Sequence, residues 1–169
     1  STATARATAL TTQDGVLVKS GAVTRRYLGT CRPRAATTYS YVRDGVLAPA
    51  RIDLWNWSNP VDVYCTVIDT TDSWTYTTAT FQQANASTNN QVDVVVGWQA
   101  FPFSVSVLGT AANSTANTAA RIAVGYDSTT TKSGVNTLEA GAANIKFGLS
   151  ASFANQPTIG NHYYAWLES

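Results

Sequence analysis

Residues 14–30 have the sequence DGVLVKSGAVTRRYLGT, and this stretch decides the fold class of the chain. Side chains along residues 16–19, and again along residues 26–29, alternate between two faces in the period-two pattern of a half-buried β-strand. Ser20 and Gly21 lie between the two runs and supply a turn. The stretch therefore predicts a β-hairpin near the start of the chain.

The same period recurs through the rest of the chain. The runs 91–99 and 101–108 are expected to hold the centre of the core, because valine and phenylalanine fill one face of each. The other predicted strands are 37–47 with a turn at Asp44-Gly45, 50–57, 61–68, 74–81, 121–126, 145–153 and 162–167. The predicted breaks are a polar loop at 82–90, a small-residue insert at 111–120 and a Thr-rich turn at 127–134.

This succession of short strands predicts an all-β protein. About ten strands, with turns every 8–12 residues or so and no helical period, favour an antiparallel β-sandwich, most simply a jelly roll. An immunoglobulin-like sandwich ranks second, because Cys31 and Cys65 are only 34 positions apart. A chain of 169 residues can bury one core unaided. We expect an arm or peripheral strand at 1–13 and a single sandwich domain at 14–169.

Composition and charge limit the classes of partner that the chain is expected to bind. Thr and Ala, at 25 each, are the commonest residues, and only 12% of the chain is charged. The net charge of +1 conceals an asymmetry, with a balance of +6 in residues 1–51 and −5 in residues 52–169. The two parts are expected to attract each other within a subunit, between subunits or across a lattice contact. Two readings of the arginines stay open, pairing with acidic neighbours on the strand faces or contacts in an assembly.

Cysteine and histidine are too few for most metal and nucleophilic chemistry. Cys31 and Cys65 allow one disulfide or two reduced thiols, and neither state is preferred. No metal and no cofactor are expected, because a four-ligand site would need both thiols, His162 and a carboxylate. His162 is the only histidine and is expected to have a structural role in its strand. No apolar run of 18 residues occurs, so no membrane span is expected.

The aromatic residues are the most suggestive population for binding. Trp55 and Trp57 are two positions apart and point to one face of their strand, where two indoles beside Asn and Gln could form a saccharide platform. Packing of the same face into the core or a subunit interface is the alternative. Acid pairs at Asp53 with Asp62, or Asp69 with Asp72, keep a hydrolase as a third class, although Asp69 and Asp72 more naturally close a turn.

The sequence of residues 14–30 resembles a segment of tailed-bacteriophage virion proteins, of the kind found in head or tail appendages. Weaker similarities occur at Leu54-Trp-Asn-Trp57, Phe81-Gln-Gln-Ala-Asn85 and His162-Tyr-Tyr-Ala-Trp-Leu-Glu168. The resemblance implies a non-enzymatic structural protein of the virion, assembled in the host cytoplasm. Such a protein would act as a capsid decoration, a cement or a fibre component.

The resemblance also implies the partners. A homo-oligomer, most simply a trimer, would bind a major capsid or appendage protein of the virion. The candidate assembly contacts are Arg25, Arg26, Arg32 and Arg34. Two alternatives stay open: a receptor-binding tip that recognises a host surface glycan, and a small-virus jelly-roll coat protein. Nucleic-acid packaging is disfavoured, because these arginines are spread through strands and not concentrated in a basic tail.

Overall fold

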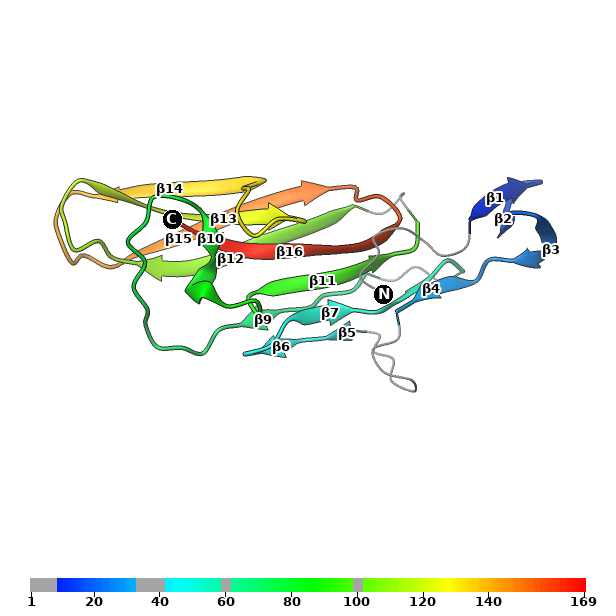
Figure 1. Ribbon diagram of the computed structural model, residues 1–169, viewed down its shortest axis with the longest axis horizontal. Coiled ribbons are helices and arrows are strands. Elements are labelled where there is room, and N and C mark those ends of the chain that lie inside the picture. The colour runs from blue at the N-terminus through cyan, green and yellow to red at the C-terminus, as the bar shows by residue number, and fades with distance from the viewer. Residues whose placement is uncertain (1–8, 33–41, 59–61, 99–101) are drawn as a thin grey trace.

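The computed structural model describes residues 9–32, 42–58, 62–98 and 102–169. Within these ranges the chain forms an elongated all-β structure with sixteen strands, one short 3₁₀ helix and no α-helix (Figure 1). The first ten strands are β1 (Leu10–Gln13), β2 (Val16–Lys19), β3 (Ala22–Arg26), β4 (Gly29–Cys31), β5 (Val42–Arg43), β6 (Gly45–Val46), β7 (Ala50–Ile52), β8 (Leu54–Asn56), β9 (Val67–Ile68) and β10 (Gln82–Gln83). After the helix η1 (Ala84–Ala86) come β11 (Gln91–Val96), β12 (Phe103–Ala111), β13 (Thr118–Tyr126), β14 (Gly134–Ala140), β15 (Phe147–Asn155) and β16 (Gly160–Glu168).

The main sheet is organised around β16. Its strand order is β14-β13-β16-β11-β7-β5, and β10 adds a short antiparallel pairing to β16. All pairings in this sheet are antiparallel except β11 with β7, which is parallel. The strand nearest the end of the sequence therefore lies in the middle of the largest sheet (Figure 1).

A second layer, the antiparallel pair β12–β15, covers one face of the main sheet. The core lies between the two layers, and the opposite face of β13 and β16 carries a smaller cluster around Leu167 and Phe81. The buried members of the main core are Ile52, Val94, Val96, Val107, Ile122, Val124, Leu149, Ala151 and Tyr164. The predicted all-β sandwich is thus confirmed, while the jelly-roll connectivity is not established by these pairings.

The burial of two strands follows directly from their sequences. In β11 the residues Val94, Val95 and Val96 are all buried, because a central strand covered on both faces is apolar on both faces. In β12 the side chains Phe103, Val105 and Val107 turn toward the core, while the serines between them are exposed. Both runs lie in the core region, as predicted.

The hairpin predicted from residues 14–30 is present, as β2 and β3 joined at Ser20-Gly21. Gly21 has a φ of +75°, which suits glycine in a tight turn. A strand from the predicted arm, β1, pairs with β2 and completes a three-stranded sheet at one end of the molecule (Figure 1). The predicted second strand is divided, because the chain leaves β3 at Tyr27 and begins β4 at Gly29.

Two predicted strands are wrong. Of the described residues 62–68 in the first run, only Val67 and Ile68 form a strand, and none of the run 74–81 does. Alternating side chains do not by themselves provide a neighbouring strand for the backbone, and Tyr64 is 82% exposed. Instead, residues 69–81 run beside the main sheet, where Trp74 contacts Trp166 and Phe81 packs on the cluster around Leu167.

Three smaller differences concern strand ends and turns. Asp44 does not make a hairpin turn: it separates β5, which pairs with β7, from β6, which pairs in parallel with β9. The insert at 111–120 is shorter than predicted, because β13 begins at Thr118. The strand β14 was not predicted, since Gly134, Asn136 and Glu139 weaken its period-two signal.

Candidate functional site

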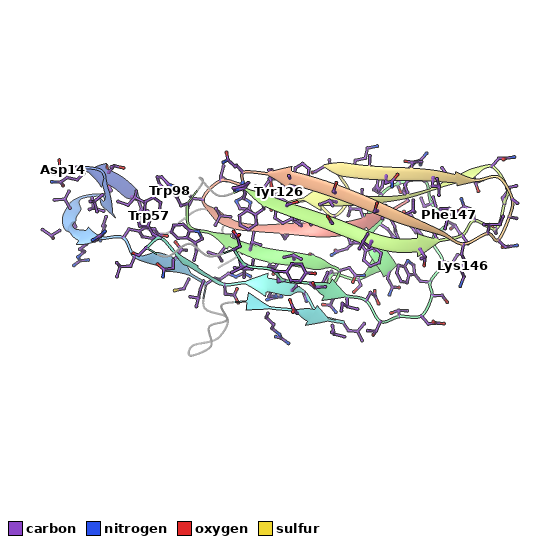
Figure 2. All side chains as sticks on the ribbon, turned by 180° about the vertical axis from the view of Figure 1, so that it is seen from behind. Asp14, Trp57, Trp98, Tyr126, Lys146 and Phe147 are labelled. Atoms are coloured by element: carbon purple, nitrogen blue, oxygen red, sulfur yellow. The ribbon has the colours of Figure 1, made fainter. Side chains whose placement is uncertain are left out.

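Trp55 and Trp57 belong to a packed aromatic cluster formed with Tyr27 and Trp98. The ring centroids of Tyr27 and Trp55 are 5.9 Å apart, those of Trp55 and Trp57 5.8 Å, and those of Trp57 and Trp98 4.9 Å. The Trp55 indole also lies against Gly97, where any side chain would collide with it. Figure 2 shows Trp57 beside Trp98, near the three-stranded sheet. The two indoles that were predicted to share a face are in contact, but their planes are tilted by 43°.

The candidate assembly arginines have different surroundings. Arg25 and Arg26 are exposed on β3, and their role as assembly contacts stays a prediction. Arg34 lies outside the described residues. Arg32 is half-buried and directs its guanidinium inward.

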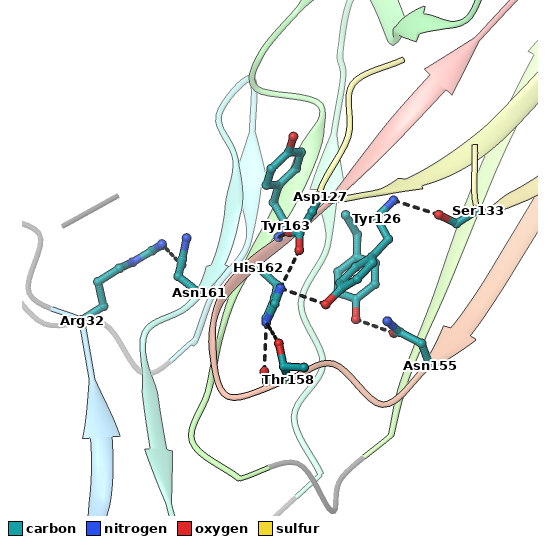
Figure 3. Close-up of polar contacts among 10 residues, drawn as sticks. Arg32, Tyr126, Asp127, Ser133, Asn155, Thr158, Asn161, His162 and Tyr163 are labelled. Carbon is teal, nitrogen blue, oxygen red and sulfur yellow. Dashed lines mark hydrogen bonds and ion pairs between the residues drawn. The ribbon is translucent and has the colours of Figure 1, made fainter. Parts of the chain in front are cut away.

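Arg32 links the start of the chain to the main sheet. Its Nε is 3.3 Å from Oδ1 of Asp53, whose side chain is fully buried, and its Nη2 is 3.4 Å from Oδ2 of Asp93. A third donor, Nη1, bonds to the side-chain oxygen of Asn161 on β16 (Figure 3). Arg51 Nε lies 3.4 Å from the same Asp93 oxygen. The basic first part and the acidic second part of the sequence therefore attract each other within one subunit.

His162 is buried on β16 and has hydrogen-bond partners at both ring nitrogens (Figure 3). Its Nδ1 lies 2.6 Å from Oδ2 of Asp127 and 2.9 Å from the Tyr126 hydroxyl. Its Nε2 lies 2.9 Å from the Thr158 carbonyl oxygen. Asp127 also accepts the backbone N–H of Tyr163, so one carboxylate fixes the ring and the strand together. These contacts agree with the structural role predicted for His162.

The carboxylate of Asp69 is held by several donors. Asn90 and Asn85 donate side-chain N–H groups to Oδ2 at 2.8 and 3.0 Å, and the backbone N–H of Thr71 donates to Oδ1 at 2.9 Å. The Asn90 bond is the main reason that the pKa of Asp69 lies well below its ordinary range. The bond from Thr71 is an Asx turn, as predicted for this segment.

Asp69 should make the stability of the protein depend on acid. Its folded-state pKa is lowered, so its contribution is present above the ordinary value of about 3.9 and is lost as pH falls toward the folded-state value. We expect the free energy of unfolding of the wild type to fall more steeply below about pH 4 than that of Asp69→Asn. Urea denaturation between pH 6 and pH 2.5 or so measures this difference.

The control is Asp72→Asn, because Asp72 lies three residues further along the same segment and its side chain is exposed. This variant should keep the acid dependence of the wild type. If the free energy of unfolding fell equally steeply with pH in the wild type and in Asp69→Asn, the acid dependence could not be assigned to Asp69.

A cavity of about 450 Å³ opens where residues 69–76 meet the ends of β12, β13 and β16, and we name it the end cavity. Trp74, Tyr76 and Trp166 supply its aromatic surface. Its volume lies within the range of small-ligand sites, about 300–1,000 Å³. Lys146 lines it, and Figure 2 places Lys146 at the opposite end of the molecule from Trp57. The end cavity and the aromatic cluster are therefore separate sites.

Some polar groups of the end cavity already form hydrogen bonds within the protein. Glu168 accepts the Trp74 indole N–H at 2.6 Å, the Asn85 backbone N–H at 3.0 Å and a Gln82 amide N–H at 3.3 Å. In contrast, Trp166 Nε1 and Ser169 Oγ are buried and have no hydrogen-bond partner within the described ranges. Both residues line the end cavity.

Five exposed large apolar side chains lie on or next to the β6–β9 pair and in the segment that leads into β9, and we name these residues the apolar edge. Val46 and Ile68 lie side by side in the parallel register, with exposed fractions of 59% and 50%. Leu47 follows directly, and Tyr64 is the most exposed member. The members of the apolar edge are Val46, Leu47, Val63, Tyr64 and Ile68.

The cysteines are both free in this structure. Cys31 is exposed, and Cys65 packs partly against the main core. Burial, with a smaller effect of Asp44, raises the pKa of the Cys65 thiol to about 11. No cluster of three or more His, Cys, Asp or Glu side chains suited to a metal ion occurs among the residues that the structure describes.

The end cavity and the apolar edge were not identified from the sequence. Both combine segments that lie far apart along the chain, and the tryptophan content was the only available signal for the cavity. Within the described ranges, no helix has the length and apolar character needed to cross a membrane. Comparisons with protein-family models, with curated proteins and with solved structures found no match to this chain.

Proposed function

We propose that this chain is a non-enzymatic structural protein of a bacteriophage virion, which assembles with copies of itself through the apolar edge. Two independent features support the proposal. The first is the resemblance of residues 14–30 to segments of virion proteins. The second is the apolar edge, which is the observation that carries the assembly role.

The exposure of the apolar edge is costly for a lone chain. Soluble monomers rarely expose a contiguous group of large apolar side chains, and such groups typically mark protein interfaces. Tyr64 is 82% exposed, and each member of the apolar edge retains more than a third of its surface. Burying these side chains against a second copy would remove apolar surface from water at about 25 cal/mol per Å².

The left-handed backbone conformation of Leu47 adds a second free-energy cost, which burial in an assembly would offset. Leu47 has a φ of +51°. This left-handed conformation is common for glycine, but bulky residues such as leucine seldom adopt it. Two bonds hold it there: the Leu47 N–H donates to the Ile68 carbonyl oxygen at 3.0 Å, and the Asn89 side-chain N–H donates to the Leu47 carbonyl oxygen at 2.8 Å. The fold thus maintains a strained backbone at a residue whose side chain is more than half exposed. Such strain is typical of functional segments.

Contacts with other virion proteins would use a different surface. Arg25 and Arg26 are exposed on the three-stranded sheet at one end of the molecule and suit an acidic patch on a capsid or appendage protein. The trimeric state rests on the resemblance alone. The protein would act by surface complementarity in the virion.

The oligomeric state of the purified chain tests the assembly surface. Light scattering on the wild type at micromolar concentration should give a closed oligomer, and Val46→Lys with Ile68→Lys should give a monomer of unchanged secondary structure. The expected cause is the cost of burying two ammonium groups in an interface. The matched control is Val135→Lys with Ile145→Lys, which changes a similarly exposed pair elsewhere and should keep the oligomer. A monomeric wild type would contradict assembly through the apolar edge.

Electron microscopy tests the virion role. Wild-type protein added to virions stripped of it should bind at regular positions, whereas Arg25→Glu with Arg26→Glu should bind much less while keeping the oligomer. A wild-type oligomer that leaves such virions bare would contradict the virion role.

A further inference from the structure

We propose that the end cavity is a saccharide-binding site, separate from the aromatic cluster around Trp55 and Trp57. The inference does not rest on the assembly role, because the end cavity and the apolar edge share no residue. It rests on three features of the end cavity: two crossed indoles, a fixed carboxylate and a mixture of acidic and basic side chains.

The indoles of Trp74 and Trp166 form a corner inside the end cavity. Their ring centroids are 5.8 Å apart, and their planes cross at 70°. The outer edge of the Trp166 ring lies against Gly109, where even a methyl group would press on it at 3.3 Å. The aromatic corner is therefore held on one side by β12. A flat aromatic face with polar groups at its border suits a sugar ring, which has C–H faces and a rim of hydroxyl groups.

Glu168 supplies a fixed acceptor next to this corner. Its carboxylate has about four acceptor positions, and the three bonds from Trp74, Asn85 and Gln82 use three of them. Because these donors fix the carboxylate in advance, a ligand hydroxyl that donates to the remaining position need not order it. The Trp74 indole N–H donates its hydrogen bond to Glu168, and this bond fixes the indole ring in place.

The polar and aromatic groups of the end cavity set the chemical class of the ligand. Glu168 supplies an acceptor, and Trp74, Tyr76 and Trp166 supply the aromatic surface. A purely apolar ligand would leave the remaining acceptor position of Glu168 unused. A ligand with hydroxyl groups can donate to Glu168 while an apolar face packs on a ring. Among the common ligand classes, a saccharide presents both around one ring.

The charges in the end cavity fit the same class. Asp69, Asp72 and Glu168 line it together with Arg121 and Lys146, so neither sign dominates. A phosphate-rich ligand would meet the carboxylates as well as the two basic groups. A neutral sugar has no such conflict, and a sugar acid can use Arg121 or Lys146 as a partner.

The test measures binding of the full chain to an array of neutral and acidic oligosaccharides, followed by titration calorimetry with the best glycan. Trp74→Leu should raise the Kd for that glycan at least tenfold. Trp57→Leu is the matched control and should leave the Kd unchanged, because it alters the aromatic cluster at the other end of the molecule. Thermal unfolding of each variant shows whether it is folded.

A second variant keeps the test decisive if Trp74→Leu fails to fold. Ala112 is exposed and lines the end cavity, so Ala112→Trp places bulk in the site without removing a packed side chain. It should also raise the Kd at least tenfold. Either of two outcomes would overturn the proposal: no glycan on the array bound by the wild type, or binding lost in Trp57→Leu and kept in Ala112→Trp. Neither depends on the oligomeric state that tests the apolar edge.

Discussion

Replacement of Leu167 by alanine is expected to lower the free energy of unfolding by about 3 kcal/mol, within the range of about 2–5 kcal/mol for buried leucines. Leu167 has no exposed surface and packs with Ala123, Ala165 and Phe81 on the outer face of the main sheet. Its strand, β16, pairs with β13, β11 and β10, so a cavity at this position cannot close by the movement of one free edge. Urea denaturation followed by tryptophan fluorescence measures the loss.

Leu108→Ala is the matched control for this prediction. Leu108 is 75% exposed on the outer face of β12, so the same substitution should change the free energy of unfolding by less than about 0.5 kcal/mol. Equal losses in the two variants would show that β16 is not at the centre of the sheet as the structure places it.

The strands with strong period-two patterns could be located from the sequence. In β12, apolar side chains at Phe103, Val105 and Val107 alternate with exposed serines, and the core contacts only that face. The structure extends this strand by three residues, to Ala111. Such strands are identified correctly because one buried face imposes the pattern on the residues themselves.

The same period-two pattern predicted a strand wrongly where no neighbouring strand was available for pairing. Residues 74–81 alternate regularly, yet the segment packs beside the sheet and forms no strand within it. Trp74 donates to Glu168, and Phe81 packs on the Leu167 cluster, so its aromatic residues are used in tertiary contacts. A pattern of side chains records which face is apolar, but it does not record which backbone lies alongside.

The order of the strands could not be predicted from local patterns. Gln91 lies opposite Ala165, and Ile122 lies opposite Glu168, so the central pairings join residues that are far apart in the sequence. The end cavity depends on these pairings, because it forms only when residues 69–76 are brought over the ends of β13 and β16. Trp55 and Trp57 could be singled out from their spacing, whereas Trp74 and Trp166 could not.

Replacement of Arg32 by methionine is the second large effect that we expect, a loss of about 2 kcal/mol in the free energy of unfolding. Methionine keeps most of the apolar stem but removes the guanidinium that faces Asp53 and Asp93. Breaking a fully buried ion pair costs about 3–5 kcal/mol, and breaking an exposed one about 0–1 kcal/mol. Arg32 lies between these limits, because its side chain is 18% exposed while that of Asp53 is fully buried.

Arg25→Met is the matched control for Arg32→Met, because Arg25 is exposed on β3 and its loss should cost less than about 0.5 kcal/mol. Arg32 approaches residues of three elements, since Asp53 follows β7, Asp93 is in β11 and Asn161 is in β16. Loss of its guanidinium should therefore loosen the connection between residues 9–32 and the main sheet. Proteolysis of the folded variant would then begin in that part of the chain. Equal stability of the two variants would instead place Arg32 with the exposed arginines and restore it as a candidate assembly contact.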